Sequence, residues 1–477
     1  MVFKTVGRIV KAETLLLLLP AAVAAIYGEM TVSLAFLVAA AVALVAGTLL
    51  TVTCRPKNNS IYAKEGFAIV ALAWIAMSAI GALPFVISGE ITSYIDAFFE
   101  TVSGLTTTGA SILADVEAMS HGLLFWRSFT HWIGGMGVLV FVMALLPNLS
   151  DRSIHIMRAE MPGPTVGKLV PRAKDTAKIL YLIYICMTLA EVILLLCGGM
   201  PFFDSVVHSF GTAGTGGFGI KADSIAGYTP YLQWVITVFM FLFGINFNLF
   251  YLILIGRAKA IFKSTELWAY VGIVTAGITA IAVNISNMYG SISEAIRHSA
   301  FQVSSVITTT GYATVNFDAW PDFSKAILLI LMFIGACAGS TGGGIKISRI
   351  VLMVKMIFNE IRFMVRPRSV NALRFEGKSV DEQTQKSVGN YFLIYGICLF
   401  LIFLVISAEP FGFETNFTAV IACFNNIGPG FGKVGPMGSF APYSSFSKLI
   451  LSFAMLLGRL EIFPLIIALS PGTWTKK

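Results

Sequence analysis

Long runs of apolar residues constrain this chain more than any other feature of its sequence. Ten of them are candidates for membrane-spanning helices, each of which needs roughly 20 mostly apolar residues. These runs cover residues 13–28, 32–53, 67–87, 121–147, 178–199, 230–256, 267–287, 324–358, 389–408 and 446–470. Only 12% of the 477 residues are charged, against about 25% in soluble proteins. We therefore expect an all-α integral membrane protein.

The end of the first run and the spacing of the cysteines argue against a signal peptide, a disulfide scaffold and a zinc site. No A-x-A-like cleavage site follows the first run, so we expect a retained membrane helix and not a removed signal peptide. The six cysteines show neither CxxC spacing nor pairing with histidine, so neither a disulfide scaffold nor a zinc site is indicated.

The positive charges are unevenly distributed. Of the 33 lysines and arginines, 26 lie in residues 1–12, 54–65, 149–178, 257–264, 346–388 and 471–477. Cytoplasmic loops carry such an excess, so we expect both termini and these segments in the cytoplasm. The net charge of +8 therefore marks a membrane face. No basic stretch is interleaved with base-stacking aromatic residues, and we expect no nucleic-acid partner.

Four stretches between the apolar runs share one pattern. They read DAFFETVSGLTTTGAS (96–111), DSVVHSFGTAGTGGFG (204–219), HSAFQVSSVITTTGYA (298–313) and TNFTAVIACFNNIGPG (415–430). Each places a glycine thirteen residues after its start: Gly109, Gly217, Gly311 and Gly428. The order is fixed while the spacing is irregular, which indicates a diverged fourfold repeat of helix, half-helix, glycine turn and helix.

The two residues before each glycine complete what we call turn segments 1 to 4. They are Thr107-Thr108, Thr215-Gly216, Thr309-Thr310 and Asn426-Ile427. Irregular backbone is tolerated at membrane depth only where it is buried in protein or lines a water-filled cavity. Each half-helix would direct the negative end of its dipole toward its turn, and glycine lets neighbouring carbonyls point the same way. Four such segments around one axis would replace the hydration shell of a monovalent cation, as a potassium filter does.

Further motifs give the chain a specific resemblance over essentially its whole length. They are RSFTHWIGGMGV (127–138), FGINFNLFY (243–251), AGSTGGGIKISR (338–349), NNIGPGFG (425–432) and LLGRLEIFP (456–464). With the four turn segments, they resemble the membrane subunit of bacterial Trk-type (TrkH/TrkG) potassium uptake systems. That family belongs to the superfamily that also contains the Ktr and plant HKT transporters.

The resemblance implies a fold of four diverged helix–pore-loop–helix repeats around one ion pore, with an additional N-terminal pair of transmembrane helices. The implied units are residues 1–53, 54–150, 151–260, 261–370 and 371–477. It also implies potassium as the substrate, held at the turn segments, with no other cofactor in this chain. A homodimer in the bacterial inner membrane is implied, together with a cytosolic, nucleotide-binding RCK subunit (TrkA-like).

The resemblance also carries a selectivity rule. Glycine at all four turn positions goes with potassium in this superfamily, whereas serine in the first repeat goes with sodium permeation. This chain has all four glycines, but Gly216 and Asn426-Ile427 replace the Thr-Thr pair. We therefore expect unequal rings that discriminate less sharply than a symmetric filter.

Residues 335–346, GACAGSTGGGIK, interrupt the eighth apolar run. Ile345 separates Gly344 from Lys346, and the preceding run is helical, so a phosphate-binding P-loop is disfavoured. Five glycines disfavour a helix by about 1 kcal/mol each, so the helix should break beside the pore. The resemblance makes this loop a gate, formed by Gly335, Gly339, Ser340, Thr341, Gly342, Gly343, Gly344 and Lys346. Close helix packing through small residues is the alternative.

Arg459 lies within the last apolar run, where a charge costs between ~2.5 and ~17 kcal/mol. We expect helix on both sides of it and expect Arg459 to cap the unpaired carbonyls of the broken loop; a snorkelling side chain is the alternative. Glu100 would either attract cations or form hydrogen bonds behind the turn. Arg127 is expected to anchor its helix at the membrane interface, and Lys346 would be a gate contact or a topology charge.

Three functions fit these features. They are a gated, channel-like potassium uptake protein, a symporter coupled to protons or sodium, and the conducting subunit of a Kdp-like ATP-driven pump. The pump is disfavoured because no DKTGT motif occurs, and an enzyme because the histidines and acidic residues form no catalytic cluster. The apolar runs carry no chain of carboxylates that suggests a proton relay, so we favour the channel-like mechanism over symport.

Overall fold

The computed structural model describes residues 1–54, 63–137, 173–367 and 372–474. Helices dominate this part of the chain. Its two strands, β1 (Arg374–Phe375) and β2 (Lys378–Ser379), form a small antiparallel hairpin in which Arg374 pairs with Ser379.

An N-terminal pair of helices stands apart from the rest in sequence. It consists of α1 (Val2–Ile26) and α2 (Met30–Thr53). The two helices approach each other closely at Gly7 and Gly47, where a methyl group added to either glycine would meet the backbone oxygen of the other. Such contacts between small residues are common where helices pack in membranes. Helix α1 begins eleven residues before the expected run, because residues 2–12 continue its helix.

Four units follow, and each contains a long helix, a shorter buried helix, a turn segment and a further helix after the turn, as expected. The first two units comprise α3 (Ala63–Gly81), α4 (Leu83–Ile87), α5 (Tyr94–Leu105) and α6 (His121–Gly135), then α9 (Ala173–Cys197), α10 (Phe202–Gly214), α11 (Pro230–Phe243), α12 (Phe247–Leu254) and η2 (Ala258–Lys263). The third comprises α13 (Thr265–Ile285), η3 (Ser286–Met288), α14 (Ile292–Ile307), η4 (Phe317–Ala319), α15 (Asp322–Ile334) and α16 (Ile347–Val365). The fourth comprises α17 (Glu382–Ile406), α18 (Phe413–Phe424), η5 (Gly432–Val434), α19 (Ser445–Arg459), α20 (Phe463–Leu469) and α21 (Pro471–Trp474).

The short helices α5, α10, α14 and α18 each end at a turn segment. Side-chain caps fix where two of them begin, because Ser93 accepts a hydrogen bond from the backbone N–H of Asp96 and Ser291 accepts one from that of Glu294. In α5, every residue from Phe99 to Leu105 is buried. The last four residues of α10, α14 and α18 are buried as well, so all four helices end inside the protein.

Within the described residues, six helical stretches are long and apolar enough to cross a membrane, and two bent pairs raise the number to eight. The straight stretches match the runs expected at 13–28, 32–53, 67–87, 178–199, 267–287 and 389–408. The eighth run breaks between α15 and α16, as expected. The run expected over 121–147 is helical from 121 to 135, and its residues beyond 137 lie outside the described part.

Two of the ten expected runs were predicted wrongly as continuous helices. The run 230–256 bends by 91° between α11 and α12, and the run 446–470 bends by 118° between α19 and α20. Asn246 caps the start of α12 by accepting from the N–H of Asn248, at 3.0 Å. Pro464 lies in the first turn of α20, where its missing N–H is tolerated. Both residues were visible signals for a new helix start.

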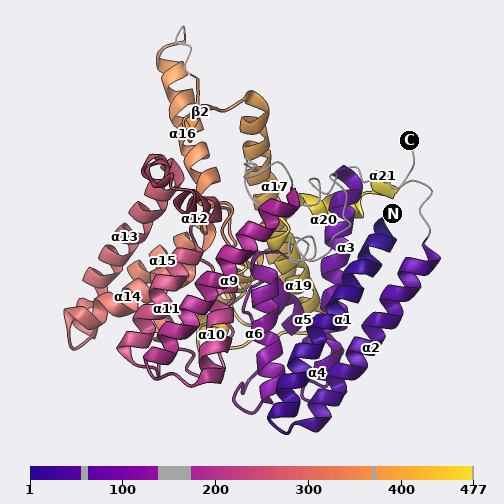
Figure 1. The fold of residues 1–477 in the computed structure, drawn as a ribbon. Coiled ribbons are helices and arrows are strands. Elements are labelled where there is room, and N and C mark those ends of the chain that lie inside the picture. Colours follow the sequence, from indigo (N-terminus) through magenta and orange to yellow (C-terminus); the bar gives the residue numbers. More distant parts are fainter. Residues whose placement is uncertain (55–62, 138–172, 368–371, 475–477) are drawn as a thin grey trace.

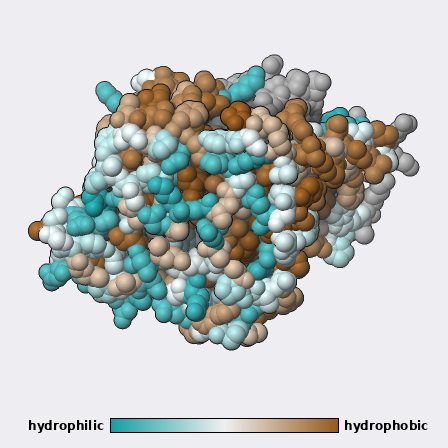
Figure 2. Space-filling view, turned by 90° about the horizontal axis from the view of Figure 1, so that it is seen from below, coloured by the Kyte–Doolittle hydropathy of each residue, from teal (hydrophilic) through white to brown (hydrophobic). Residues whose placement is uncertain are grey.

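The elements form one compact body with a projection on one side. Figure 1 shows α16 and α17 extending beyond the body on either side of the β hairpin, with the N-terminus and α21 toward the same end of the molecule. Figure 2 views the opposite end and shows hydrophilic residues over much of its centre and left, with hydrophobic residues gathered along its upper and right margins.

The expected unit boundaries remain a prediction. The boundary at 53/54 falls at the end of α2, and the boundary at 260/261 falls within η2. The boundaries at 150/151 and 370/371 lie outside the described residues, as does most of the basic segment 149–178.

Candidate functional site

The four turn segments share one backbone conformation. In each, the first residue has a positive φ: 56° at Thr107, 55° at Thr215, 60° at Thr309 and 57° at Asn426. The glycine two positions later also has a positive φ, while the residue between them does not. Positive φ is uncommon for residues other than glycine. Its occurrence at the same position in four stretches that lie far apart in the sequence therefore reflects a shared local structure.

The four glycines lie in a closed ring. A methyl group added to Gly109 would overlap the carbonyl oxygen of Gly216, and one added to Gly217 would overlap that of Thr310. One added to Gly311 would overlap the carbonyl oxygen of Ile427. The ring closes at Gly428, where a methyl group would press against the carbonyl oxygen of Thr108. Each segment thus abuts the next one in chain order, and the fourth abuts the first. Only glycine fits at these four positions.

The side chains behind the ring differ between segments. The hydroxyl groups of Thr106 and Thr108 are 2.8 Å apart, and those of Thr308 and Thr310 are also 2.8 Å apart. In segment 4, the amide nitrogen of Asn426 donates to the Thr108 hydroxyl at 3.0 Å, which ties the fourth segment to the first. In segment 4, which lacks the Thr-Thr pair, the Asn426 side chain thus forms a contact with another segment.

A cavity of about 170 Å³ lies on one side of the ring. Its lining includes Gly109, Gly217, Gly311 and Gly428 together with the loops that follow turn segments 1, 2 and 4. Each turn segment follows the C-terminal end of a short helix. The cavity therefore lies on the side of the ring where the chain leaves the turn segments.

Glu100 and Arg127 form an ion pair at the wall of this cavity, which Arg127 lines. The Nε of Arg127 lies 2.8 Å from a carboxylate oxygen of Glu100, and both side chains are almost fully buried. Glu100 also accepts from the hydroxyl of Ser111 and the N–H of Ile112, each at 3.0 Å. The hydrogen-bonding alternative for Glu100 therefore agrees with the structure. Arg127 is not an interface anchor, because its charge pairs with Glu100 inside the protein.

The loop predicted from the glycine-rich motif lies on the other side of the ring. It occupies residues 335–346 between α15 and α16, and its Cys337, Thr341 and Lys346 are buried. The N–H of Gly343 donates to the hydroxyl of Thr309 at 2.6 Å, which joins the loop to turn segment 3. Gly335, Gly339 and Gly344 have positive φ, a conformation that glycine adopts without strain.

The bend between α11 and α12 holds the outer part of this loop. The N–H of Cys337 donates to the carbonyl of Gly244 at 3.1 Å, and the N–H of Phe247 donates to the carbonyl of Gly339 at 3.0 Å. The Thr341 hydroxyl donates to the carbonyl of Phe243 at 3.2 Å. The bend between α11 and α12, which was not predicted from the sequence, thus holds the loop in place. Backbone groups that are unpaired at the bend form hydrogen bonds with the loop.

One carboxylate joins the first part of the loop to the start of α16. Glu266 in the first turn of α13 accepts from the N–H of Ala338 at 2.7 Å and from the N–H of Ser348 at 3.2 Å. Lys346 points back into the loop, and its ammonium group donates to the carbonyl of Gly342. Of the two alternatives for Lys346, the contact with the loop is the one that agrees with this geometry.

Arg459 reaches the loop from the opposite side. It donates to the carbonyl of Thr341 at 2.9 Å and to the hydroxyl of Thr107 at 3.1 Å. It also donates to the carbonyls of Gly134 and Gly135, the latter at 2.7 Å, at the end of α6. The expectation of helix on both sides of Arg459 is wrong, since it is the last residue of α19. Snorkelling is excluded by its four acceptors inside the protein.

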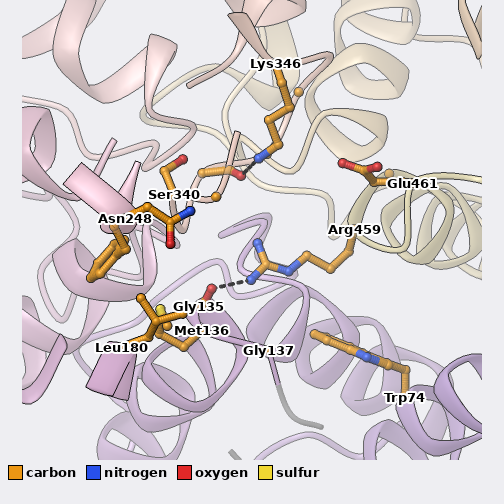
Figure 3. A pocket seen from close by; sticks show the side chains of 16 residues that line it. Trp74, Gly135, Met136, Gly137, Leu180, Asn248, Ser340, Lys346, Arg459 and Glu461 are labelled. Atoms are coloured by element: carbon orange, nitrogen blue, oxygen red, sulfur yellow. Dashed lines mark hydrogen bonds between the residues drawn. The ribbon is translucent and has the colours of Figure 1, made fainter. Parts of the chain in front are cut away.

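A second cavity, of about 50 Å³, lies among these groups. The loop glycines from Gly339 to Gly344, the end of α6 and Arg459 line it. Figure 3 shows Arg459 and Lys346 approaching this space from different elements, with the guanidinium directed toward Gly135. The loop and the Arg459 guanidinium thus lie on the opposite side of the ring from the cavity of about 170 Å³.

Sequence reasoning missed an ion pair at the base of this region. Arg349 in α16 contacts Glu461 with its two terminal nitrogens, at 2.5 and 3.3 Å. The Arg349 guanidinium also lies 4.0 Å from the centre of the Tyr391 ring. Arg349 and Glu461 lie 112 residues apart in the sequence. No local pattern could have identified that pair.

Among the described residues, no group of three or more His, Cys, Asp or Glu side chains is placed to hold a metal ion. The oxygens that surround the ring are carbonyls and hydroxyls. This is the ligand type that suits a monovalent cation in a potassium filter and not a transition metal.

A closed ring of four backbone turns, reached by four buried half-helices and set between two cavities, defines a membrane protein that passes a small ion. Comparison with known proteins agrees with this class. The model of the TrkH family, described as "Cation transport protein", matches residues 33–268 and 252–474.

Three relatives show how far the similarity extends. The chain is 37% identical to the Trk system potassium uptake protein TrkH of Salmonella typhimurium and 36% identical to that of Escherichia coli K12, each over 99% of both chains. The crystal structure of the potassium transporter TrkH from Vibrio parahaemolyticus matches with a TM-score of 0.89, at 31% identity over 99% of both chains. The chain therefore belongs to the TrkH family of cation transport proteins, and the expectation that it is a transporter and not an enzyme is confirmed.

Proposed function

We propose that this protein takes up potassium ions across the cytoplasmic membrane through the ring formed by turn segments 1 to 4. The single observation that carries the proposal is the closure of the ring, in which each glycine abuts a carbonyl of the next segment. The relatives named above are potassium uptake proteins, which supports potassium as the substrate. In this proposal the ion is cargo, and the chain itself uses no other cofactor.

The loop 335–346 and Arg459 form the gate in this proposal. A cation leaving the ring would meet the guanidinium of Arg459 and the backbone of Thr341 and Gly343, all held by hydrogen bonds. A fixed positive charge opposes cation passage in a low-dielectric site. Conduction therefore requires the loop to move away from Arg459, and the five loop glycines give its backbone the freedom to do so.

Regulation in trans completes the proposal. The α16–β hairpin–α17 projection extends beyond the body of the protein at the end where the termini lie (Figure 1). It leads directly out of the gate loop, so a cytosolic RCK-domain, TrkA-like subunit docked on it would act on the gate. We further propose a homodimer in the bacterial inner membrane with both termini in the cytoplasm, in keeping with the distribution of lysines and arginines.

A coupled symporter is the second candidate function. Two carboxyl groups favour it, because Glu13 in α1 and Glu191 in α9 are fully buried within spanning helices. Buried intramembrane carboxyls can take part in proton transfer. Neither residue lines the two cavities described above, and for this reason we place the symporter second.

The test is cation competition for rubidium uptake into liposomes that contain the purified protein. We expect potassium to compete better than sodium in the wild type, and Gly109→Ser to reduce that difference, because a side chain at Gly109 overlaps the carbonyl of Gly216. Uptake driven by a potassium gradient alone, with no dependence on pH or sodium gradients, would exclude the symporter. Preference of the wild type for sodium or ammonium would refute the substrate.

A further inference from the structure

We propose that His131 is a positioning residue for ion selectivity, which takes the place of the side chain that turn segment 2 lacks at Gly216. This inference rests on the proposed function, because it assumes that the ring of turn segments selects the ion. His131 lies on α6, in the first unit, and is completely buried.

Segment 2 lacks a brace that segments 1 and 3 possess. In those two segments, the threonine before the glycine pairs its hydroxyl with that of the threonine two positions earlier, at 2.8 Å in both cases. The equivalent positions in segment 2 are Gly214 and Gly216, so no such pair can form. With Gly217, this makes three glycines in four residues, and such a backbone has little stiffness of its own.

The ring of His131 occupies the space where a side chain at Gly216 would lie. A methyl group added to Gly216 would overlap three atoms of the imidazole. The backbone of His131 lies equally close to Gly214, where an added methyl group would overlap its carbonyl. Gly216 and His131 are therefore complementary in shape: segment 2 can lack a side chain because α6 supplies one.

Two hydrogen bonds fix the imidazole and its tautomer. Nδ1 lies 2.8 Å from the carbonyl oxygen of Gly104, which can only accept, so Nδ1 carries the proton. Nε2 then has a free lone pair and accepts from the N–H of Phe218 at 3.3 Å. The neutral imidazole thus joins the last turn of α5 to the residue that directly follows Gly217.

The Phe218 side chain strengthens this arrangement. Its ring centre lies 4.3 Å from that of His131, and the guanidinium of Arg127 covers it at 4.1 Å. The glycine-rich backbone of segment 2 is therefore held on one side by α6 and on the other by segment 3, where Gly217 abuts the carbonyl of Thr310.

The physical consequence concerns the choice between potassium and sodium. A ring of oxygens discriminates only if its geometry and its number of ligands are maintained around the ion. If segment 2 were free to shift, the ring could contract around the smaller sodium ion. His131 would then raise selectivity without touching the ion, by holding the Gly216 and Gly217 backbone in place.

The first experiment compares substitutions at His131 in planar bilayers, using reversal potentials with potassium on one side and sodium on the other. We expect His131→Ala to lower the potassium-to-sodium permeability ratio by about tenfold, the effect of losing two hydrogen bonds between neutral groups. His131→Gln can still donate to Gly104 and accept from Phe218, so it should retain most of the ratio. His131→Phe fills the space without either bond and should fall between them.

A matched control is available in the second unit. His208 on α10 is also fully buried, but its Nδ1 bonds to the carbonyl of Asp204 within its own helix, at 2.8 Å. We expect His208→Ala to leave the permeability ratio unchanged. Equal losses of selectivity in His131→Ala and His208→Ala would mean that any buried histidine has this effect, and would overturn the proposal.

The second experiment tests complementarity directly. Gly216→Ala alone should impair selectivity or folding, because its methyl group overlaps the imidazole. In the His131→Ala background that overlap is gone, so the double variant should be closer to the wild type than Gly216→Ala is. A double variant that is worse than both single variants would contradict the shape argument. This comparison remains informative if His131→Ala alone proves unstable.

The proposal and the proposed function fail differently. If Gly109→Ser changes the permeability ratio and His131→Ala does not, the ring selects the ion but His131 does not position it. If neither variant changes the ratio, the ring itself is not the selective element, and the proposed function is refuted.

Discussion

Removal of the Arg459 guanidinium tests the gate most sharply. In the observed conformation its hydrogen bonds include two to the end of α6 and one each to Thr107 and Thr341. The bonds to α6 anchor the side chain whether or not the loop moves. The bond to the carbonyl of Thr341 exists only while the loop is in place.

The size of the effect follows from that one bond. A hydrogen bond from a charged donor contributes about 1.5 to 3 kcal/mol. Loss of this contribution from the closed state alone would raise the ratio of open to closed protein by about 10-fold to 150-fold, since 1.4 kcal/mol corresponds to tenfold. Removal of the positive charge acts in the same direction, because it lowers the electrostatic barrier to a cation below the ring.

The assay is the open probability of single proteins in a planar bilayer, without any regulatory subunit. We expect Arg459→Ala to raise it and Arg459→Lys to have a smaller effect, because lysine keeps the charge but lacks the planar fork of donors. Lys448→Met is the matched control. Lys448 is a cation on the same helix that pairs with Asp96 at 2.7 Å and does not contact the loop. An open probability in Arg459→Ala equal to that of the wild type would refute the role of Arg459.

Two further predictions concern the loop and the carboxyl group of Glu409. Gly343→Ala should raise basal rubidium uptake, because its methyl group overlaps the carbonyl of Asn425 and displaces the loop. Gly272→Ala is the control and should leave basal uptake unchanged, because the space around Gly272 is open. Basal uptake in Gly343→Ala equal to that of the wild type would count against the gate. Glu409 accepts hydrogen bonds from Ser444 and Ser447, which hold its pKa below the ordinary value. These bonds therefore stabilise the fold above about pH 4.3, the unperturbed pKa of a glutamate, and are lost as the pH falls through the lower folded-state value. The difference in melting temperature between the wild type and Glu409→Gln should be present at pH 7 and shrink below pH 4; a constant difference would contradict this reasoning.

The repeated pattern of the sequence was enough to predict the centre of the molecule. The four short helices, the glycine turns and the break at residues 335–346 follow from local composition, since glycine and threonine placed between apolar runs determine the backbone directly. The contact of Arg459 with the loop was expected from the cost of a buried charge, although its position at a helix end was not.

The features that were missed depend on distant parts of the chain. Arg127 looked like an interface anchor because Glu100 belongs to another helix, and Arg349 meets Glu461 across 112 residues. The bend after Arg459, in contrast, could have been predicted from the sequence, because Pro464 marks the start of a new helix. His131 had no local signal, since its importance depends on the absence of a side chain at Gly216 in the next unit.

Anomalous diffraction from crystals in which rubidium replaces potassium is the most direct test of whether the ring binds the transported ion. We expect electron density for rubidium on the axis between Gly109, Gly217, Gly311 and Gly428, with none at a lysine-lined or carboxylate site. An empty ring with rubidium bound elsewhere in the membrane region would contradict the account.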